Sequence, residues 1–302
     1  MIFGDGGYVG QNDPMAQSSN PEDQQRIERL VGVPGERLLD LKAHIQDRNV
    51  TRFQEIESQF LGLLWSIDTY RIEQVIPRAP AGAKVAGYSA EQLAGGIYRK
   101  KGNFFSEIIT AILSNKTESP LAPRAQVKGF SQLHQIDIAW PAPDIGVATE
   151  PIVCCEAKLT GAPAFADTPA RSVRSDWTNR RKELKFQATD LKLYRQRNSP
   201  GIRNWEHWRQ NAAPKVYAIW AGRLETPTEH EYMVTQAREL TETYLDRVGV
   251  YGFITNDAGD GYMPATDATR VAERVTSLDA VLDLIAAEIA EHRETAHQST
   301  RL

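Results

Sequence analysis

The chain has 302 residues, of which 41% are hydrophobic and 25% charged, and it carries a formal net charge of -4. No window approaches the roughly 18 to 20 consecutive apolar residues that a membrane span needs, and the start lacks the layout of a signal peptide, so we expect a cytoplasmic protein without a membrane partner. The two cysteines, Cys154 and Cys155, are adjacent in an apolar run. This arrangement excludes a disulfide framework and disfavours a structural zinc site.

Residues 1–22 are rich in Gly, Asn, Ser and Pro, which predicts a flexible N-terminal arm. Residues 23–88 follow as a helical accessory segment, in which apolar residues such as Phe53, Ile56 and Phe60 recur at helical spacing. This N-terminal helical segment could be a separate subdomain, a dimerisation element, or helices that simply pack on the core.

Residues 89–302 are expected to form the main domain. The hydrophobic pattern predicts a helix at 89–113, strands at 125–130, 133–140 and 151–158, a long basic helix at 174–197, a strand at 215–220, a helix at 230–245, a strand at 249–255 and a last helix at 277–291. An antiparallel meander followed by crossover helices indicates an α/β fold, with a mixed central β-sheet flanked by helices.

The residues that indicate chemistry lie in HQIDIAW (134–140) and IVCCEAKLTG (152–161). Side chains two apart in a strand share a face, so Glu156 and Lys158 should project together from an apolar strand. The bare pattern acidic-x-Lys occurs four times in the chain and is not specific by itself. Only Glu156/Lys158 ends a β-like run and follows another strand that carries an isolated acid.

That isolated acid is Asp137, which strand alternation places on the face opposite to His134, Ile136 and Ile138. If the two strands pair as neighbours, Asp137 can approach Glu156 within the span of a divalent ion. Mg²⁺ prefers a few carboxylate oxygens together with water and phosphate. The alternative interpretation is an ion pair at the end of a strand.

Asp137, the intervening loop and Glu156-Ala157-Lys158, together with the surrounding element order, resemble the PD-(D/E)xK nuclease superfamily, in particular type II restriction endonucleases. Ile136 stands where the motif that names the superfamily has proline. The resemblance implies a restriction-endonuclease-like core in which Asp137, Glu156 and Lys158 are catalytic. It also implies Mg²⁺, with Mn²⁺ as a substitute, bound by Asp137, Glu156 and the backbone carbonyl of Ala157.

Glu107, in GNFFSEIITAIL, fits the helix-borne acid found upstream in many of these nucleases. It shares a helix face with Asn103 and Thr110 and could point back toward the metal site. The alternative interpretation is a surface glutamate on an amphipathic helix.

Positive charge is concentrated directly after the motif. Residues 171–197 hold nine Lys/Arg against three acids, whereas residues 225–302 hold fifteen acids against six basic side chains. Clustered Lys and Arg hold phosphate backbones, although a charge run can also be a solvated helix face. The residues expected to bind DNA are Arg171, Arg174, Arg180, Arg181 and Lys185.

The resulting hypothesis is an Mg²⁺-dependent endonuclease that cleaves double-stranded DNA as a homodimer, in a restriction or related defence role. One alternative is a repair, junction-resolving or transposon nuclease of the same fold. Another is an inactive nuclease-like module that only binds DNA or protein. The chain has neither a Gly-x-Ser-x-Gly nor a His-Glu-x-x-His motif, which argues against a serine hydrolase and a zinc protease.

Overall fold

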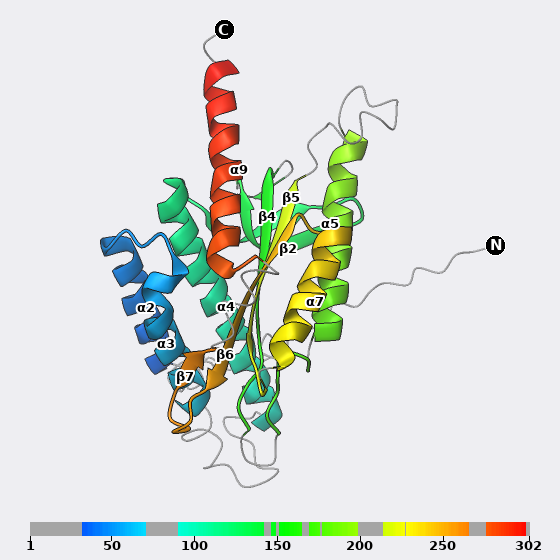
Figure 1. Cartoon of the computed structure of the whole chain (residues 1–302). Coiled ribbons are helices and arrows are strands. Elements are labelled where there is room, and N and C mark those ends of the chain that lie inside the picture. Colours follow the sequence, from blue (N-terminus) through cyan, green and yellow to red (C-terminus); the bar gives the residue numbers. More distant parts are fainter. Residues whose placement is uncertain are drawn as a thin grey trace, which may run out of the picture.

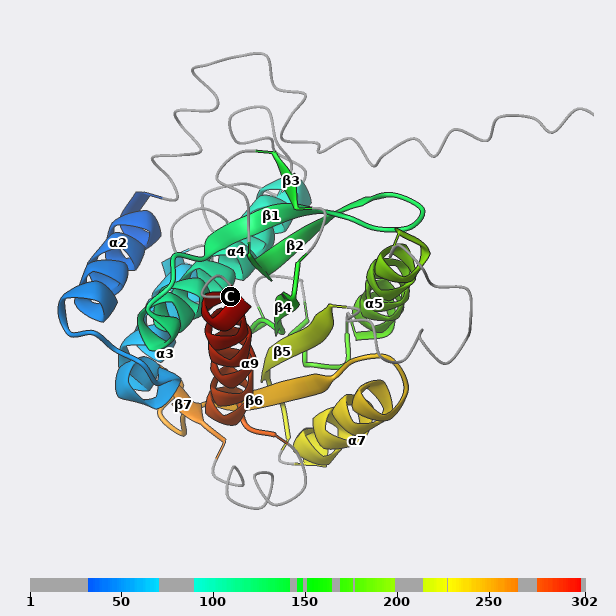
Figure 2. The same ribbon diagram turned by 90° about the horizontal axis from the view of Figure 1, so that it is seen from above.

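The computed structural model describes residues 32–70, 90–141, 146–148, 151–164, 169–175, 177–198, 214–226, 228–265 and 276–299. These residues form one seven-stranded mixed sheet with helices on both faces (Figures 1 and 2). The α/β class with a mixed, helix-flanked sheet is therefore confirmed. The expected arm, residues 1–22, lies outside the described residues. None of the described helices is long and apolar enough to cross a membrane.

The strands lie in the order β3-β1-β2-β4-β5-β6-β7. Their bounds are Ala122–Lys128 (β1), Leu133–Trp140 (β2), Val147–Ala148 (β3), Val153–Thr160 (β4), Lys215–Arg223 (β5), Arg247–Thr255 (β6) and Tyr262–Pro264 (β7). β1, β2 and β4 are antiparallel neighbours, whereas β4, β5 and β6 run parallel. The sequence did not predict β3 and β7, because two and three residues are too few to show alternation.

The helices are α2 (Gly32–Asp47), η1 (Phe53–Ile56), α3 (Glu57–Tyr70), α4 (Ala90–Thr117), α5 (Trp177–Asn198), α7 (Thr228–Thr243) and α9 (Leu278–Ser299). The basic helix expected at 174–197 is α5, and it starts three residues later than expected. α5 connects β4 to β5, and α7 connects β5 to β6. A parallel pair of strands needs such a crossover connection.

Two hydrophobic clusters lie on the two faces of the sheet. One joins α2, η1, α3, α4 and α9 to sheet residues such as Cys155 and Ile219. The other joins α5 and α7 to residues such as Cys154 and Trp220. Within the second cluster the rings of Trp177, at the start of α5, and Trp220 stack at 3.5 Å between centroids. The N-terminal helices that the structure describes thus pack into the same core as α4 and the sheet.

Candidate active site

The candidate site lies where β2 and β4 separate. The two strands pair only at Ile138↔Cys155, Ala139↔Cys154 and Trp140↔Val153, and no further pairs join them. At this fork the Asp137 carboxylate accepts a hydrogen bond from the backbone N–H of Ala157 at 2.9 Å. A side-chain oxygen thus takes the place of a backbone carbonyl as the acceptor between the two strands. The opening of the fork therefore places Asp137 beside the strand that carries Glu156 and Lys158.

The three expected catalytic side chains meet at the fork. Lys158 Nζ lies 3.7 Å from Asp137 Oδ2 and pairs with Glu156 Oε2. Both Glu156 and Lys158 belong to the face of β4 that α5 covers, since the residues that alternate with them in sequence, Cys155 and Ala157, belong to the cluster on the other face. The shared face of Glu156 and Lys158, which strand alternation predicted, is thus observed.

The regular alternation of side chains that we expected along β2 is interrupted next to Asp137. Ile136 packs in the cluster under α5, but Ile138, two residues on, packs in the cluster under α4 and α9. Ile136 and Ile138 therefore do not share a face, and the alternation breaks at Asp137. The neighbouring strand β1 shows a cause, because Arg124, between the paired positions Pro123↔Ile138 and Ala125↔Ile136, has a φ of 57°. A left-handed residue disrupts the regular pleat.

The electrostatics of the site follow from burial. Glu156 is only 2% exposed, and its pKa is raised to about 8, mainly by burial, with smaller increases from the charges of Asp137 and Glu183 and an opposing decrease from Lys158. Burial alone would lower the pKa of Lys158. The carboxylates of Glu156 and Asp137 outweigh that effect, so the pKa of Lys158 stands above its usual value and the ammonium form is favoured.

Glu156 Oε1 is buried and has no hydrogen-bond partner among the described residues. A buried acceptor without a donor costs about 1 to 3 kcal/mol, and more when it is charged. The second oxygen of the same carboxylate already meets Lys158. Oε1 therefore lacks a partner, which a cation bound at the fork would supply.

Ala157 contributes its backbone to the fork. Its N–H faces β2, where it meets Asp137. In a strand the N–H and the carbonyl of one residue face the same neighbour, so the carbonyl expected as a metal ligand also faces the fork. The observed contact, however, is made by the amide and not by the carbonyl.

Glu107, on α4, lies apart from these three side chains. Its carboxylate pairs with Lys42 Nζ at 3.0 Å and with Arg124 at 3.5 Å. The first contact joins α2 to α4, and the second joins α4 to β1. Glu107 is therefore paired with two basic side chains. Among the described residues it makes no contact with Asp137, Glu156 or Lys158.

The basic residues of α5 divide between two flanks of the helix. Arg181 and Lys185 face α7, where both bind Glu239 at 3.0 Å. These contacts lower the pKa of the Glu239 carboxyl. Arg180 instead pairs with Glu183 one turn later on the same helix, also at 3.0 Å. Of the three, only Arg180 lies on the flank that leads to the fork.

The two remaining residues expected to bind DNA lie before α5. Arg174 stacks on the ring of Tyr232 at 4.8 Å and lies 3.6 Å from Glu229. Arg171 pairs through its backbone with Ala162, just after β4. Both contacts connect the segment before α5 to neighbouring elements.

Two residues of α5 belong to the neighbourhood of the site although the sequence did not single them out as site residues. The charge of Glu183 reaches both Glu156 and Lys158. Gln187, one turn further on, is 8% exposed, and its Oε1 has no hydrogen-bond partner within the described part of the chain. Their spacing on the helix was visible in the sequence, but nothing there indicated which flank of α5 faces the fork.

The described side chains at this site offer few ligands for a metal ion. Within the described ranges, no group of three or more His, Cys, Asp and Glu side chains is placed to hold a metal ion. Asp137 and Glu156 are two carboxylates at one fork, so any further protein oxygen must come from another kind of group.

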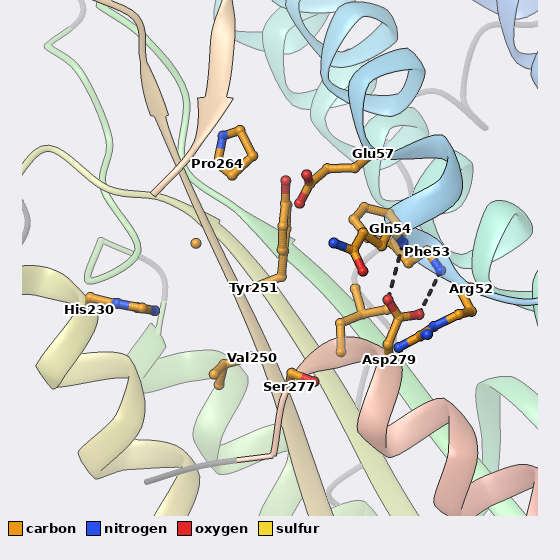
Figure 3. Close-up of a pocket in the computed structure, with 12 residues that line it drawn as sticks. Arg52, Phe53, Gln54, Glu57, His230, Val250, Tyr251, Pro264, Ser277 and Asp279 are labelled. Carbon is orange, nitrogen blue, oxygen red and sulfur yellow. Dashed lines mark hydrogen bonds between the residues drawn. The ribbon is translucent and has the colours of Figure 1, made fainter. Parts of the chain in front are cut away.

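A pocket of about 230 Å³ lies elsewhere, at the outer edge of β6 (Figure 3). Its acidic side chains are Glu57 and Asp279, and the Asp279 carboxylate accepts the backbone N–H groups of Phe53 and Gln54 at 2.6 and 3.1 Å. Asp279 thus stabilises the start of η1. The pocket shares no residue with the fork.

No protein-family model matches this chain, and neither a curated protein nor a solved structure shows significant similarity to it.

Proposed function

We propose that this chain is an Mg²⁺-dependent endonuclease that hydrolyses phosphodiester bonds of double-stranded DNA, with a PD-(D/E)xK type of active site on a restriction-endonuclease-like core. The observation that supports it most is the meeting of Asp137, Glu156 and Lys158 at one fork of the sheet. Glu156 is buried there at an energetic cost that a purely structural role would not require. Strained or costly groups of this kind gather at functional sites.

The residues at the fork fit a divalent cation. Asp137 and Glu156 supply carboxylates from neighbouring strands, and Glu156 Oε1 is a buried oxygen without a donor. Mg²⁺ binds through one or two carboxylates and completes its shell with water and phosphate oxygens. When bound, it supplies Lewis-acid chemistry, in that it acidifies water and neutralises phosphate charge. Mn²⁺ should substitute for it.

Lys158 serves as an electrostatic group. Its ammonium form is favoured by the carboxylates beside it, so it holds its positive charge at neutral pH. A fixed positive charge next to the scissile phosphate stabilises the extra negative charge that develops as water attacks. Lys158 also donates hydrogen bonds that can orient the attacking water. It does not serve as the general base, because its raised pKa keeps it protonated.

DNA would approach along the flank of α5 that leads to the fork. Arg180 is about half exposed and precedes Glu183 by one turn, next to the site. Arg181 and Lys185 share Glu239 and are less exposed than Arg180, so they contribute less to a basic surface. A homodimer with two identical sites is the simplest way to cut both strands of a duplex.

Incubation of supercoiled plasmid with the purified protein, with Mg²⁺ or with chelator, tests the proposal. Wild-type protein should linearise the plasmid only with the cation, and Asp137→Asn should abolish cleavage while the far-UV circular dichroism stays unchanged. Asp257→Asn, which alters an exposed aspartate in the β6–β7 turn, is the matched control and should cut normally. Full activity of Asp137→Asn would rule out this site, and failure of every DNA substrate to be cut would rule out the function.

A further inference from the structure

The fork-facing flank of α5 is defined by Arg180, Glu183, Gln187, Asp190 and Tyr194, which repeat at intervals of three and four residues and so lie on one side of the helix. Two contacts at the C-terminal end of this flank fix its direction. Asp190 Oδ2 lies 2.7 Å from His134 Nε2, at the start of β2, and Lys128 of β1 lies over the ring of Tyr194.

At the other end of the flank, Glu183 lies near enough to Glu156 and Lys158 for its charge to act on both. Gln187 stands one turn after Glu183 and one turn before Asp190. It therefore lies between the residue that neighbours Glu156 and the residue that binds the start of β2. The part of the sheet facing Gln187 is the fork itself, where Asp137 and Glu156 lie.

Gln187 has the same unusual property as Glu156. Each side chain is more than nine-tenths buried, and each has a buried Oε1 atom that no donor reaches within the described residues. A carbonyl oxygen and an ionised carboxylate oxygen only accept, so the two cannot satisfy each other once Glu156 is ionised. A buried acceptor is costly to leave without a partner. A bound cation would favour the ionised form of Glu156, and the cation with its water shell would offer a partner to each oxygen.

We propose that Gln187 is a ligand of the cation site, and that its side-chain oxygen contributes to the cation's coordination shell from the α5 wall, opposite Asp137 and Glu156. The inference rests on the proposed function and names a third protein group for the same site. Amide oxygens are suitable partners for hard cations. Glu183, the other candidate on this flank, is already paired with Arg180.

Titration calorimetry of the metal-free protein with Mn²⁺ and with Mg²⁺ tests the inference without relying on cleavage. Gln187→Met keeps the volume of the side chain and removes the oxygen, and it should weaken cation affinity by about 10-fold or more, as loss of a supporting group does at other metal sites. Gln187→Glu restores an acceptor with added charge and should bind the cation at least as tightly as wild type. Gln126→Met, at an exposed glutamine of β1, is the matched control and should leave affinity unchanged.

The outcomes separate this inference from the proposed function. If Asp137→Asn abolishes binding while Gln187→Met binds as wild type does, the inference is overturned and the proposed function stands. Equal weakening of affinity in Gln187→Met and Gln187→Glu would also overturn it, because a packing role would explain both. Absence of cation binding by wild-type protein would overturn both proposals. Weakening by Gln187→Met with rescue by Gln187→Glu supports the inference.

Discussion

Asp190 anchors the β1–β2 hairpin to α5, and we predict that its removal destabilises the protein strongly. The side chain is 4% exposed. Its Oδ2 meets His134 Nε2 at 2.7 Å, and its Oδ1 accepts the backbone N–H of Ser131 at 2.8 Å. The hairpin packs against these groups, since a Cβ added at Gly129 would lie 2.1 Å from Asp190 Oδ2.

The magnitude follows from burial on both sides of the pair. A buried polar group that loses its hydrogen-bond partner costs about 1 to 3 kcal/mol. Asp190→Ala leaves two such groups, the His134 ring and the Ser131 N–H, so we expect a loss of about 2 to 6 kcal/mol at pH 7. Asp190→Asn keeps an acceptor for Ser131 and should cost less, about 1 to 3 kcal/mol.

The pH dependence has a defined sign. Burial by itself would raise the pKa of Asp190, but the hydrogen bonds from His134 and Ser131 outweigh it, and the pKa lies below its usual value. A depressed carboxyl pKa gives stability that is present above the unfolded pKa, about 3.9, and is lost as the pH falls through the lower folded pKa. The difference in free energy of unfolding between wild type and Asp190→Ala should therefore shrink in acid, as the Asp190 carboxyl takes up a proton.

Urea unfolding followed by far-UV circular dichroism measures these free energies. Asp257→Ala, at an exposed aspartate, serves as the control and should change stability by less than about 0.5 kcal/mol. A change for Asp190→Ala as small as that of the control would refute the assignment of Asp190 as the hairpin anchor. A difference that grows in acid would refute the sign of the linkage.

Three further outcomes are expected. Lys158→Ala should lower the single-turnover cleavage rate at saturating enzyme by orders of magnitude and change DNA affinity only a few fold, because the loss falls on the transition state; a near wild-type rate would contradict its electrostatic role. Arg180→Ala should flatten the salt dependence of DNA binding more than Lys185→Ala, since Arg180 is about twice as exposed and lies on the flank that leads to the fork; equal slopes would contradict this division of α5. Gly129→Ala should lower the urea midpoint, because its Cβ would collide with Asp190 and His134, and an unchanged midpoint would show that the hairpin can yield.

Much of the sheet was predictable because its signal is local. β2 was expected at 133–140 and lies at Leu133–Trp140, and the strands expected at 151–158 and 249–255 lie within two residues of β4 and β6. The shared face of Glu156 and Lys158 follows from the two-residue period of a strand, which needs no knowledge of neighbours. The face of Asp137 did not follow, because it depends on the left-handed conformation of Arg124 on the adjacent strand.

The roles of the α5 side chains could not be predicted for a different reason. Helical spacing correctly placed Arg181 and Lys185 near one face, but it gives no information on which neighbour that face meets. The neighbour is α7, whose Glu239 lies more than fifty residues further along the chain and pairs with both basic side chains, Arg181 and Lys185. A local excess of positive charge therefore overstates the free basic surface. The opposite flank, with Glu183 and Gln187, reads in sequence as ordinary helix surface, and only the packing of α5 against β2 and β4 gives it a place beside the carboxylates.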